Sequence, residues 1–208
     1  MEILPVHWSI LTFDVEGFSE SYRDDRARAV VRAGFYRVLE ESFRAAGLSW
    51  PRDTYEDRGD GAVVLVSPLV PKVLLIDPFL GCLCAGLAEH NRAARLAERF
   101  RLRCAIHAGE VATDEHGMSG FDLIVACRLL DAAELHASLR NSPSALATIV
   151  SDGIYEAAIR HGFRDIDPTA YHPVRVRVKQ NRINAWLHLP VHRYPGELAT
   201  INPARDAC

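Results

Sequence analysis

The stretch ILTFDVEGFSE, residues 10–20, decides how this sequence is interpreted. It begins with an apolar run that is typical of a buried strand. The run ends at Asp14, and Glu16 and the turn-forming Gly17-Phe18-Ser19 follow directly. A second stretch, EDRGDGAVVLV at residues 56–66, places Asp60 between two glycines just before another apolar run. Both stretches therefore predict a carboxylate at the end of a buried strand.

Length and charge favour an ordinary single-domain protein. The chain has 208 residues, 49% of them hydrophobic, which is enough to fill one core. We expect the domain to span residues 1–191, with a loosely ordered tail at 192–208 where apolar periodicity is lacking. The net charge of −3 argues against a non-specific nucleic-acid binder. We find no apolar stretch of transmembrane length and no signal-peptide pattern, which predicts a cytoplasmic protein without a membrane partner.

Several common site signatures are absent from the sequence. The five cysteines show no C-x-x-C spacing and the nine histidines no H-E-x-x-H, which argues against a zinc site. Neither G-x-x-x-x-G-K-[ST] nor G-x-G-x-x-G occurs, so a P-loop or a Rossmann nucleotide site has no support.

Strands, helices and hairpins alternate along the chain. We expect a strand at 8–15 and then a helix, capped by Asp24 or Asp25, that runs to about residue 46. The further predicted elements are a hairpin around Gly59-Asp60-Gly61, a helix from Asp77-Pro78 to about 96, two strands in 101–117 that turn at Ala108-Gly109-Glu110, a helix from about 122, a strand and helix in 145–159, and a closing hairpin in 174–189. This order predicts an α+β fold in which helices pack on a central mixed or antiparallel sheet.

The two strand-end carboxylates point to metal chemistry. Two carboxylates buried side by side repel each other, and a divalent cation removes that cost. Mg²⁺ and Mn²⁺ prefer such oxygen ligands and complete their shell with water and substrate phosphates. Gly17-Phe18-Ser19 would expose backbone N–H groups to those phosphates if it leads into the first helix. The alternative is that Asp-Gly is a common hairpin turn and that aspartate often ends a strand.

In this order and at this spacing, the motifs resemble the class III nucleotide cyclases, the catalytic domain of adenylate and guanylate cyclases. The resemblance covers residues 8–190. It rests on FDVEGFS at 13–19, Gly59-Asp60-Gly61, LRCAIHAGEVA at 102–112 with Ala105 in place of the usual glycine, Gly120 with ACRLLDAA at 126–133, and VRVKQNRINAWLHL at 176–189 with Gln180 in place of glycine.

The resemblance implies a ferredoxin-like core and a mechanism. Two Mg²⁺ or Mn²⁺ ions per site would bridge Asp14, Val15 and Asp60 to a nucleoside triphosphate. The 3′-hydroxyl would attack the α-phosphorus, pyrophosphate would leave, and Arg128 would stabilise the transition state. Active sites in this family form between two chains, so a homodimer with shared sites is implied.

The sequence departs from the family at the positions that read the nucleotide. The base-selecting position carries Glu56, which accepts hydrogen bonds and so favours GTP or a pyrimidine nucleotide over ATP. The second base position is Gly117, which implies an open pocket wall. The ribose-orienting position is Ile124, which makes no hydrogen bond, and Asp122 two positions away is expected to point elsewhere. Lys179 and Arg182 lie where the family contacts phosphates, and the alternative, which we favour, is that both are ordinary solvated charges.

Two functions remain open on this sequence. The first is an active cyclase, and the unusual base positions would suit the standalone pyrimidine cyclases of bacterial antiviral defence. The second is a cyclase-like module that binds nucleotide or a partner without turnover, which Ile124 and Gly117 favour. An unrelated α+β protein with chance matches is the remaining alternative.

Overall fold

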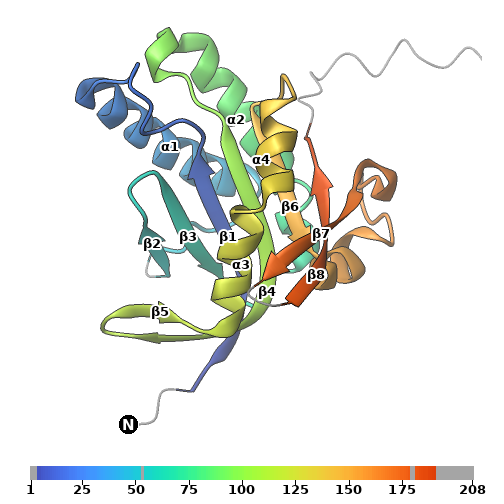
Figure 1. Ribbon diagram of the computed structural model, residues 1–208. Helices are drawn as coiled ribbons and strands as arrows, with labels where there is room; N and C mark the ends of the chain where they lie inside the picture. Colours follow the sequence, from blue (N-terminus) through green and yellow to red (C-terminus); the bar gives the residue numbers. More distant parts are fainter. Residues whose placement is uncertain (1–3, 53, 179–180, 191–208) are drawn as a thin grey trace, which may run out of the picture.

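The computed structural model describes residues 4–52, 54–178 and 181–190, and it shows an α+β fold around one mixed sheet (Figure 1). The sheet has eight strands, seven of them in the order β2-β3-β1-β4-β6-β8-β7, with β5 paired to β4. Strands β4 and β6 pair in parallel, and the other neighbours are antiparallel. The predicted fold class is confirmed. The predicted tail at 192–208 lies outside the described residues.

The elements have the following bounds. The strands are β1 Val6–Val15, β2 Tyr55–Asp57, β3 Gly61–Val66, β4 Leu102–Asp114, β5 Gly117–Ser119, β6 Leu146–Ser151, β7 His172–Val178 and β8 Asn181–His188. The helices are α1 Asp25–Ala45, α2 Phe79–Ala93, α3 Phe121–Leu130, α4 Ala133–Arg140 and α5 Asp152–Ile154, with 3₁₀ turns at Lys72–Leu75, Leu96–Glu98 and Pro168–Ala170 and a π turn at Tyr155–Ile159.

Helices cover both faces of the sheet, and the alternation of side chains along β1 sets which face is which. Leu11, Phe13 and Val15 join the large core beneath α1 and α2. Ile10 points to the opposite face, where α3 packs, and Thr12 Oγ1 donates to the carbonyl of Ala126 on α3 at 3.4 Å. Figure 1 shows α3 and α4 in front of the sheet and α1 and α2 behind it. Because side chains alternate along a strand, Asp14 belongs to the α3 and α4 face.

Helix α1 begins and ends where its sequence predicts. Asp24 is the N-cap, and its Oδ1 accepts a hydrogen bond from Ala27 N at 2.7 Å. This bond satisfies one of the backbone donors that the first turn of a helix leaves without an intrahelical partner. The helix ends at Ala45, and Gly47 follows with a φ of +72°, in the left-handed region that glycine adopts readily.

The prediction that two strands turn at Ala108-Gly109-Glu110 is wrong. Residues Leu102–Asp114 form one continuous strand, β4, and the chain turns back only to form the short β5 at Gly117–Ser119. Gly109 is needed for a close approach and not for a turn, because a Cβ built there would lie 2.1 Å from Cγ of Asp122 on α3. The glycine therefore lets α3 lie against β4.

The segment around α2 differs from its prediction in two ways. The N-cap of α2 is Pro78, without a side-chain hydrogen bond, while Asp77 Oδ2 accepts from Arg164 Nε at 2.8 Å. Residues Lys72–Ala93 are, by length and composition, apolar enough to cross a membrane, contrary to the expectation that no such stretch exists. In the fold this segment divides into a 3₁₀ turn and α2, and the buried Leu83 and Leu87 pack into the core against α1.

Candidate active site

Asp14 and Asp60 lie at adjoining ends of two paired strands. Asp14 is opposite Gly61 in the register of β1 and β3, so Asp60 immediately precedes its partner. The carbonyl of Asp60 accepts a hydrogen bond from Val15 N at 2.8 Å, which ties the two strand ends together. Burial raises the pKa of the Asp14 carboxyl, and the charge of Asp60 raises it further, against the opposing effect of Arg103. The two carboxylates are therefore close enough for the charge of Asp60 to affect the pKa of Asp14.

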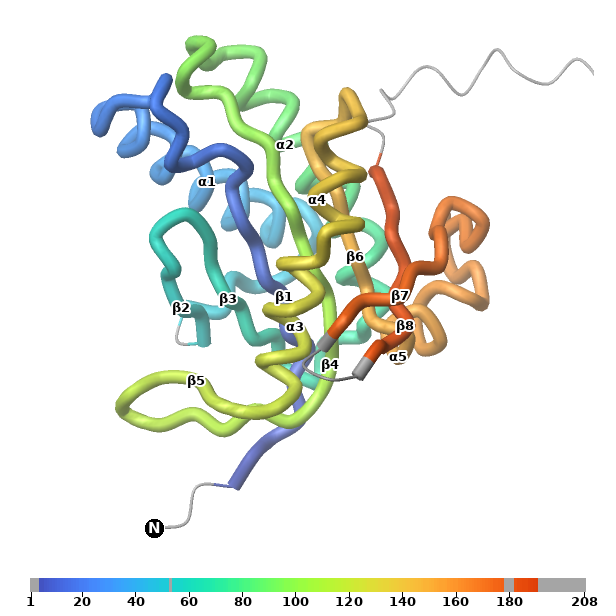
Figure 2. Tube along the Cα trace, viewed as in Figure 1, coloured from blue at the N-terminus to red at the C-terminus, as the bar shows by residue number. Residues whose placement is uncertain are grey.

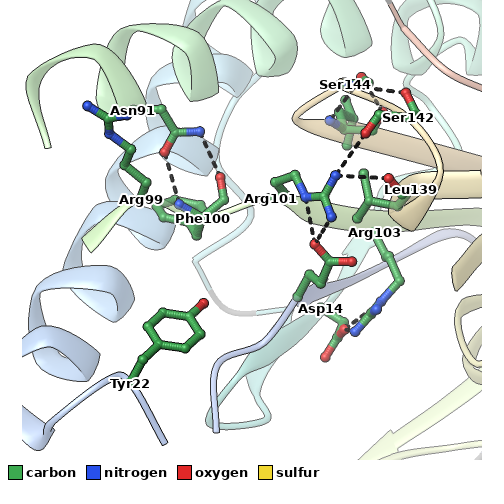
Figure 3. Close-up of polar contacts among 12 residues, drawn as sticks. Asp14, Tyr22, Asn91, Arg99, Phe100, Arg101, Arg103, Leu139, Ser142 and Ser144 are labelled. Carbon is green, nitrogen blue, oxygen red and sulfur yellow. Dashed lines mark hydrogen bonds and ion pairs between the residues drawn. The ribbon is translucent and has the colours of Figure 1, made fainter. Parts of the chain in front are cut away.

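Arg103 on β4 supplies the positive charge that faces Asp14. The two residues are directly opposite each other in the antiparallel register of β1 and β4. Arg103 Nε donates to Asp14 Oδ2 at 2.8 Å, and Nη2 of the same guanidinium also contacts that oxygen (Figure 3). Only 12% of the arginine side chain and 23% of the aspartate side chain are exposed, so water screens this pair weakly. Arg103 thus favours the charged form of Asp14 and opposes the effect of burial, which raises the pKa of this carboxyl.

A second ion pair lies beside the first and reaches helix α4. Arg101 Nε donates to Glu16 Oε2 at 2.6 Å, and Nη1 donates to the carbonyls of Leu139 and Ser142, each at 2.9 Å. Figure 3 shows Arg101 extended toward these two carbonyls. They belong to the C-terminal end of α4, where a cation is favourable. The pair therefore fixes α4 against the end of β1.

Gly17, Phe18 and Ser19 lie beside this site but do not lead directly into a helix. They form a turn after β1, in which Gly17 has a φ of +66° and Glu20 N donates to the Gly17 carbonyl at 3.3 Å. Helix α1 begins only at Asp25, after a further loop. The glycine turn therefore does not lead into the first helix, which begins after the predicted cap Asp24.

Glu56 and Gly117, predicted to contact the base, are in direct contact with each other. Glu56 Oε1 accepts a hydrogen bond from Met118 N at 2.6 Å, and Oε2 pairs with Arg58 Nη2 at 2.6 Å. Gly117 has a φ of +119°, and a Cβ built there would lie 2.4 Å from Glu56 Oε1. Gly117 therefore does not leave an open wall, since the space that a side chain would take is filled by the Glu56 carboxylate.

A series of hydrogen-bonded side chains connects α3 to the sheet. Ser151 Oγ lies 2.8 Å from His107 Nδ1, and His107 Nε2 lies 3.2 Å from Asp122 Oδ1. The other oxygen of Asp122 accepts a hydrogen bond from Glu110 N at 2.7 Å. Asp122 therefore points into the sheet, and it is not placed to substitute for a ribose contact at Ile124. Burial lowers the pKa of His107, although the Asp122 carboxylate opposes this effect.

Ile124 and Arg128 are one helical turn apart on the exposed part of α3. Ile124 is 38% exposed, and Arg128 Nη1 lies 3.8 Å from Asp131 Oδ2 in an exposed pair. Among the described residues, Arg128 forms no ion pair with Asp14 or Asp60. Arg182 lies on β8 and lines a pocket that Arg128 also lines. Lys179 falls outside the described residues.

The donor set at Asp14 and Asp60 fits a magnesium or manganese ion. Both ligands are hard carboxylate oxygens, and Arg103 contacts only Oδ2 of Asp14, so Oδ1 of that carboxylate is the oxygen that a metal ion would use. No group of three or more His, Cys, Asp or Glu side chains suited to a metal occurs within the described part of the chain. The protein would therefore supply two carboxylates and the adjacent Val15 backbone, with water and substrate phosphates as the other ligands.

The sequence interpretation missed the partners of these carboxylates. Arg103 lies in β4 and Arg101 immediately precedes this strand, while Asp14 lies in β1 and Glu16 immediately follows it. Opposite charges that face each other across an antiparallel pair are favourable. This complementary spacing was visible in the sequence, but the antiparallel register that aligns it was not.

Solved structures of cyclase domains share this fold. The guanylyl cyclase Cya2 gives a TM-score of 0.62 at 18% identity, over 90% of this chain and 93% of that one. An adenylate/guanylate cyclase/hydrolase from Silicibacter pomeroyi gives 0.61 at 18% identity, over 90% and 98%. The guanylate cyclase domain of RhGC from Catenaria anguillulae, solved in complex with GTP, gives 0.60 at 14% identity, over 87% and 94%. No family model and no curated protein matches the sequence. The chain thus has the fold of adenylate and guanylate cyclase domains.

Proposed function

We propose that this chain is a nucleotide cyclase, which converts a nucleoside triphosphate to a 3′,5′-cyclic nucleotide and pyrophosphate. The observation that carries the proposal is the pair Asp14 and Asp60, brought to adjoining strand ends with Asp14 half-buried beside Arg103. The two neighbouring carboxylates repel each other, and Arg103 contacts only Asp14, so a cation bound between the two aspartates would be favourable. In the reaction of a nucleotide cyclase, a metal cation and a substrate phosphate are both present at such a site.

In this proposal Asp14, Asp60 and the Val15 carbonyl hold two Mg²⁺ or Mn²⁺ ions. When bound, these ions neutralise phosphate charge and lower the pKa of the attacking 3′-hydroxyl. Arg128 donates hydrogen bonds to the phosphoryl oxygens as their charge grows, because a guanidinium matches that geometry. The turn at Gly17–Ser19 follows the end of β1, and its backbone N–H groups would contact the phosphates in this proposal.

A homodimer completes the proposed site. Arg128 is on α3, and within one chain its ion pair is with Asp131 at 3.8 Å. An arginine that serves a site containing Asp14 is therefore assigned to a second copy of the chain. Each dimer would have two composite sites, with the aspartates from one protomer and the arginine from the other.

Glu56 favours GTP, CTP or UTP over ATP in this proposal. An ionised carboxylate only accepts hydrogen bonds, and adenine presents an acceptor at N1. Facing acceptors cost about 1–3 kcal/mol in a partly dry pocket, which corresponds to a preference of roughly fivefold to 150-fold. Met118 N and Arg58 hold the carboxylate in place, so its position is fixed before a base arrives.

A second candidate is a cyclase-like module that binds nucleotide without turnover. Ile124 favours it, because this position has no group that can orient a ribose hydroxyl. The ion pair of Arg103 with Asp14 also favours it, since the carboxylate is already neutralised within the chain. The two candidates differ in product formation alone.

The test is to incubate the purified chain with Mn²⁺ and each of the four nucleoside triphosphates and to identify cyclic products by mass spectrometry. We expect product with GTP, CTP or UTP, and less with ATP. Asp14→Ala should abolish product, whereas Asp25→Ala, which removes an exposed carboxylate on α1, should leave it unchanged. Glu56→Lys should shift the preference toward ATP. Nucleotide binding without any cyclic product would favour the inactive module.

A further inference from the structure

A pocket of about 320 Å³ lies where the hairpin β7–β8 meets the first residue of α5. Figure 2 shows this hairpin at the opposite edge of the sheet from β2, with α5 beside it. The volume is within the range of small-molecule sites. The pocket is lined by Asp152, Pro173, Val174, Arg175, Asn184 and Trp186. The cyclase resemblance assigns no role to any of these residues.

The indole of Trp186 and the candidate metal ligands lie on opposite faces of the sheet. Trp186 packs against the core beneath α1 and α2, whereas Ala185 and Leu187, its neighbours along β8, are buried in the core that α3 and α4 cover. Asp14 belongs to the α3 and α4 face, because side chains alternate along β1. A ligand that contacts the indole is therefore separate from one held by Asp14.

The ring of Trp186 is held in a fixed orientation. Tyr155 stacks on it, with ring centroids 3.6 Å apart and an interplanar angle of 6°. The indole Nε1 donates to Asp152 Oδ1 at 3.0 Å. Tyr155 is the first residue of the π turn Tyr155–Ile159, a rare backbone form that is frequent at functional sites. The remaining surface of the indole lines the pocket, and its orientation is set before any ligand binds.

Polar groups with unused hydrogen-bonding capacity surround this aromatic surface. Pro173 is directly opposite Trp186 in the register of β7 and β8, and the next pair on the same face is Arg175 and Asn184. Within the described part of the chain, the side chains of Arg175 and Asn184 form no hydrogen bond or ion pair with another residue. Asp152 uses Oδ1 for the indole, so Oδ2 can still accept a hydrogen bond.

These groups fit a planar ring that carries one negative charge. An indole stacks on aromatic rings, and a guanidinium binds phosphate oxygens. The Asn184 amide can donate and accept at a ring edge, and Asp152 Oδ2 can accept from an amino group or a hydroxyl. The lining has one arginine and one aspartate, so an anion with several charges would be repelled by Asp152 and matched by Arg175 alone. A 3′,5′-cyclic nucleotide has the required chemistry, a flat base and a single phosphodiester charge.

We infer that this pocket binds a cyclic nucleotide, with the base on Trp186 and the phosphodiester beside Arg175. The inference rests on the proposed function for the source of the ligand, which is the product of the proposed reaction. That product would then bind the chain at a second site, apart from the one that forms it. Binding itself depends only on the contacts that line the pocket.

The direct test is calorimetric titration of the full chain with cyclic GMP, cyclic CMP, cyclic UMP and cyclic AMP, without metal. We expect all four to bind, because stacking on an aromatic side chain tolerates every base. Trp186→Leu should weaken binding roughly fivefold to 150-fold, the range for loss of a stacked base. Arg175→Gln should weaken it about tenfold or more, as for loss of a hydrogen bond to a charged group.

Matched variants control for charge and for folding. Arg26→Gln, at an exposed position on α1, removes the same charge as Arg175→Gln and should change affinity less than about twofold. Circular dichroism checks that each variant is folded. Arg175 is exposed, so its replacement keeps the test decisive if Trp186→Leu does not fold.

Tryptophan fluorescence locates the bound ligand. The chain has three tryptophans, at positions 8, 50 and 186. We expect the cyclic nucleotide to quench the wild-type emission, and Trp186→Phe to lose this quenching while it keeps part of the calorimetric affinity, because phenylalanine still stacks. Asp14→Ala should bind as tightly as the wild type. Binding that is lost in Asp14→Ala but kept in Trp186→Leu and Arg175→Gln would place the ligand at the candidate active site and overturn the inference.

Two further arms identify the ligand class and separate this inference from the proposed function. The uncharged nucleoside should bind more weakly than the cyclic nucleotide, and tighter binding of a 5′-nucleoside monophosphate would overturn the choice of a singly charged ligand. Binding at Trp186 by a chain that forms no cyclic product would uphold the pocket and defeat the proposed function. Product formation by a chain that shows no calorimetric binding of any cyclic nucleotide would overturn the pocket and leave the proposed function standing.

Discussion

The charge state of His107 affects how strongly α3 is held against the sheet, because the histidine ring contacts Asp122 on α3. Its ring lies between Ser151 and Asp122, and burial lowers its pKa. A histidine with a lowered folded-state pKa is favoured in its neutral form. Its contribution to stability is therefore present above the unfolded pKa of about 6.5 and is lost as the pH falls through the lower folded value. The charged and titratable groups that face it are Asp122 and, more distantly, His7.

The free energy of unfolding should therefore depend on pH through His107. We expect the wild-type chain to lose stability between pH 7.5 and pH 5, and His107→Gln to lose less over the same interval, because glutamine does not titrate there. Urea unfolding at both pH values measures the two slopes. His161→Gln, at an exposed position that does not act on His107, is the matched control and should keep the wild-type slope. Parallel pH profiles for all three proteins would show that the ring is not the titrating group.

Single residues were also where the sequence was most informative about the candidate site. An apolar run that ends at Asp14 and another that begins just after Asp60 predict a strand-end carboxylate at each position, and the register places the two together. Their partner Arg103 could not be assigned, because ion pairs across a sheet depend on register, which is set by long-range packing. Gly117 was misjudged for the same reason, since the residue that fills its space is Glu56, distant in sequence.

Strand β4 shows how an element can be misread from a correct local signal. Gly109 is a residue that often marks a turn, yet it lies within a 13-residue strand. The glycine serves a contact with α3, a contact between elements that no local pattern reports. Helix α4 was not predicted, because its eight residues directly follow α3 and extend one apolar pattern. The hairpin β2–β3 and helix α1 were predictable because their turn and cap are local.

Replacement of Gly109 tests whether the close contact of α3 with β4 matters for the fold. Gly109→Ala should destabilise the chain by about 1–3 kcal/mol, because the added methyl overlaps Cγ of Asp122, a short side chain already fixed by hydrogen bonds. Gly81→Ala on the exposed side of α2 is the control. It meets no atom within 4 Å and should stabilise the helix by about 0.5–1 kcal/mol. Chemical unfolding measures the free energy of unfolding of both variants. Equal stabilisation by the two substitutions would mean that α3 can move away from β4 at no cost.

At the scale of the whole molecule, the proposed function requires two chains. A mixture of Asp14→Ala and Arg128→Ala chains should form heterodimers in which one composite site is intact. Random exchange would restore about a quarter of the wild-type activity, since half of the dimers are mixed and each has one working site. The cyclic product formed by the mixture, compared with each variant alone, is the measurement. Native mass spectrometry of the mixture confirms that heterodimers are present, and their failure to make product would place each active site within one chain.

The central position of β1 matters while the chain is being made. β1 is bonded to β3 on one side and to β4 on the other, and β4 begins only at Leu102. At a synthesis rate of about 5–20 residues per second, one edge of β1 stays open for roughly 5 to 20 seconds after it emerges. Ile10, Leu11 and Phe13 make that edge an apolar template for other strands. The interval between the emergence of β1 and of β4 is therefore when the nascent chain most needs a chaperone.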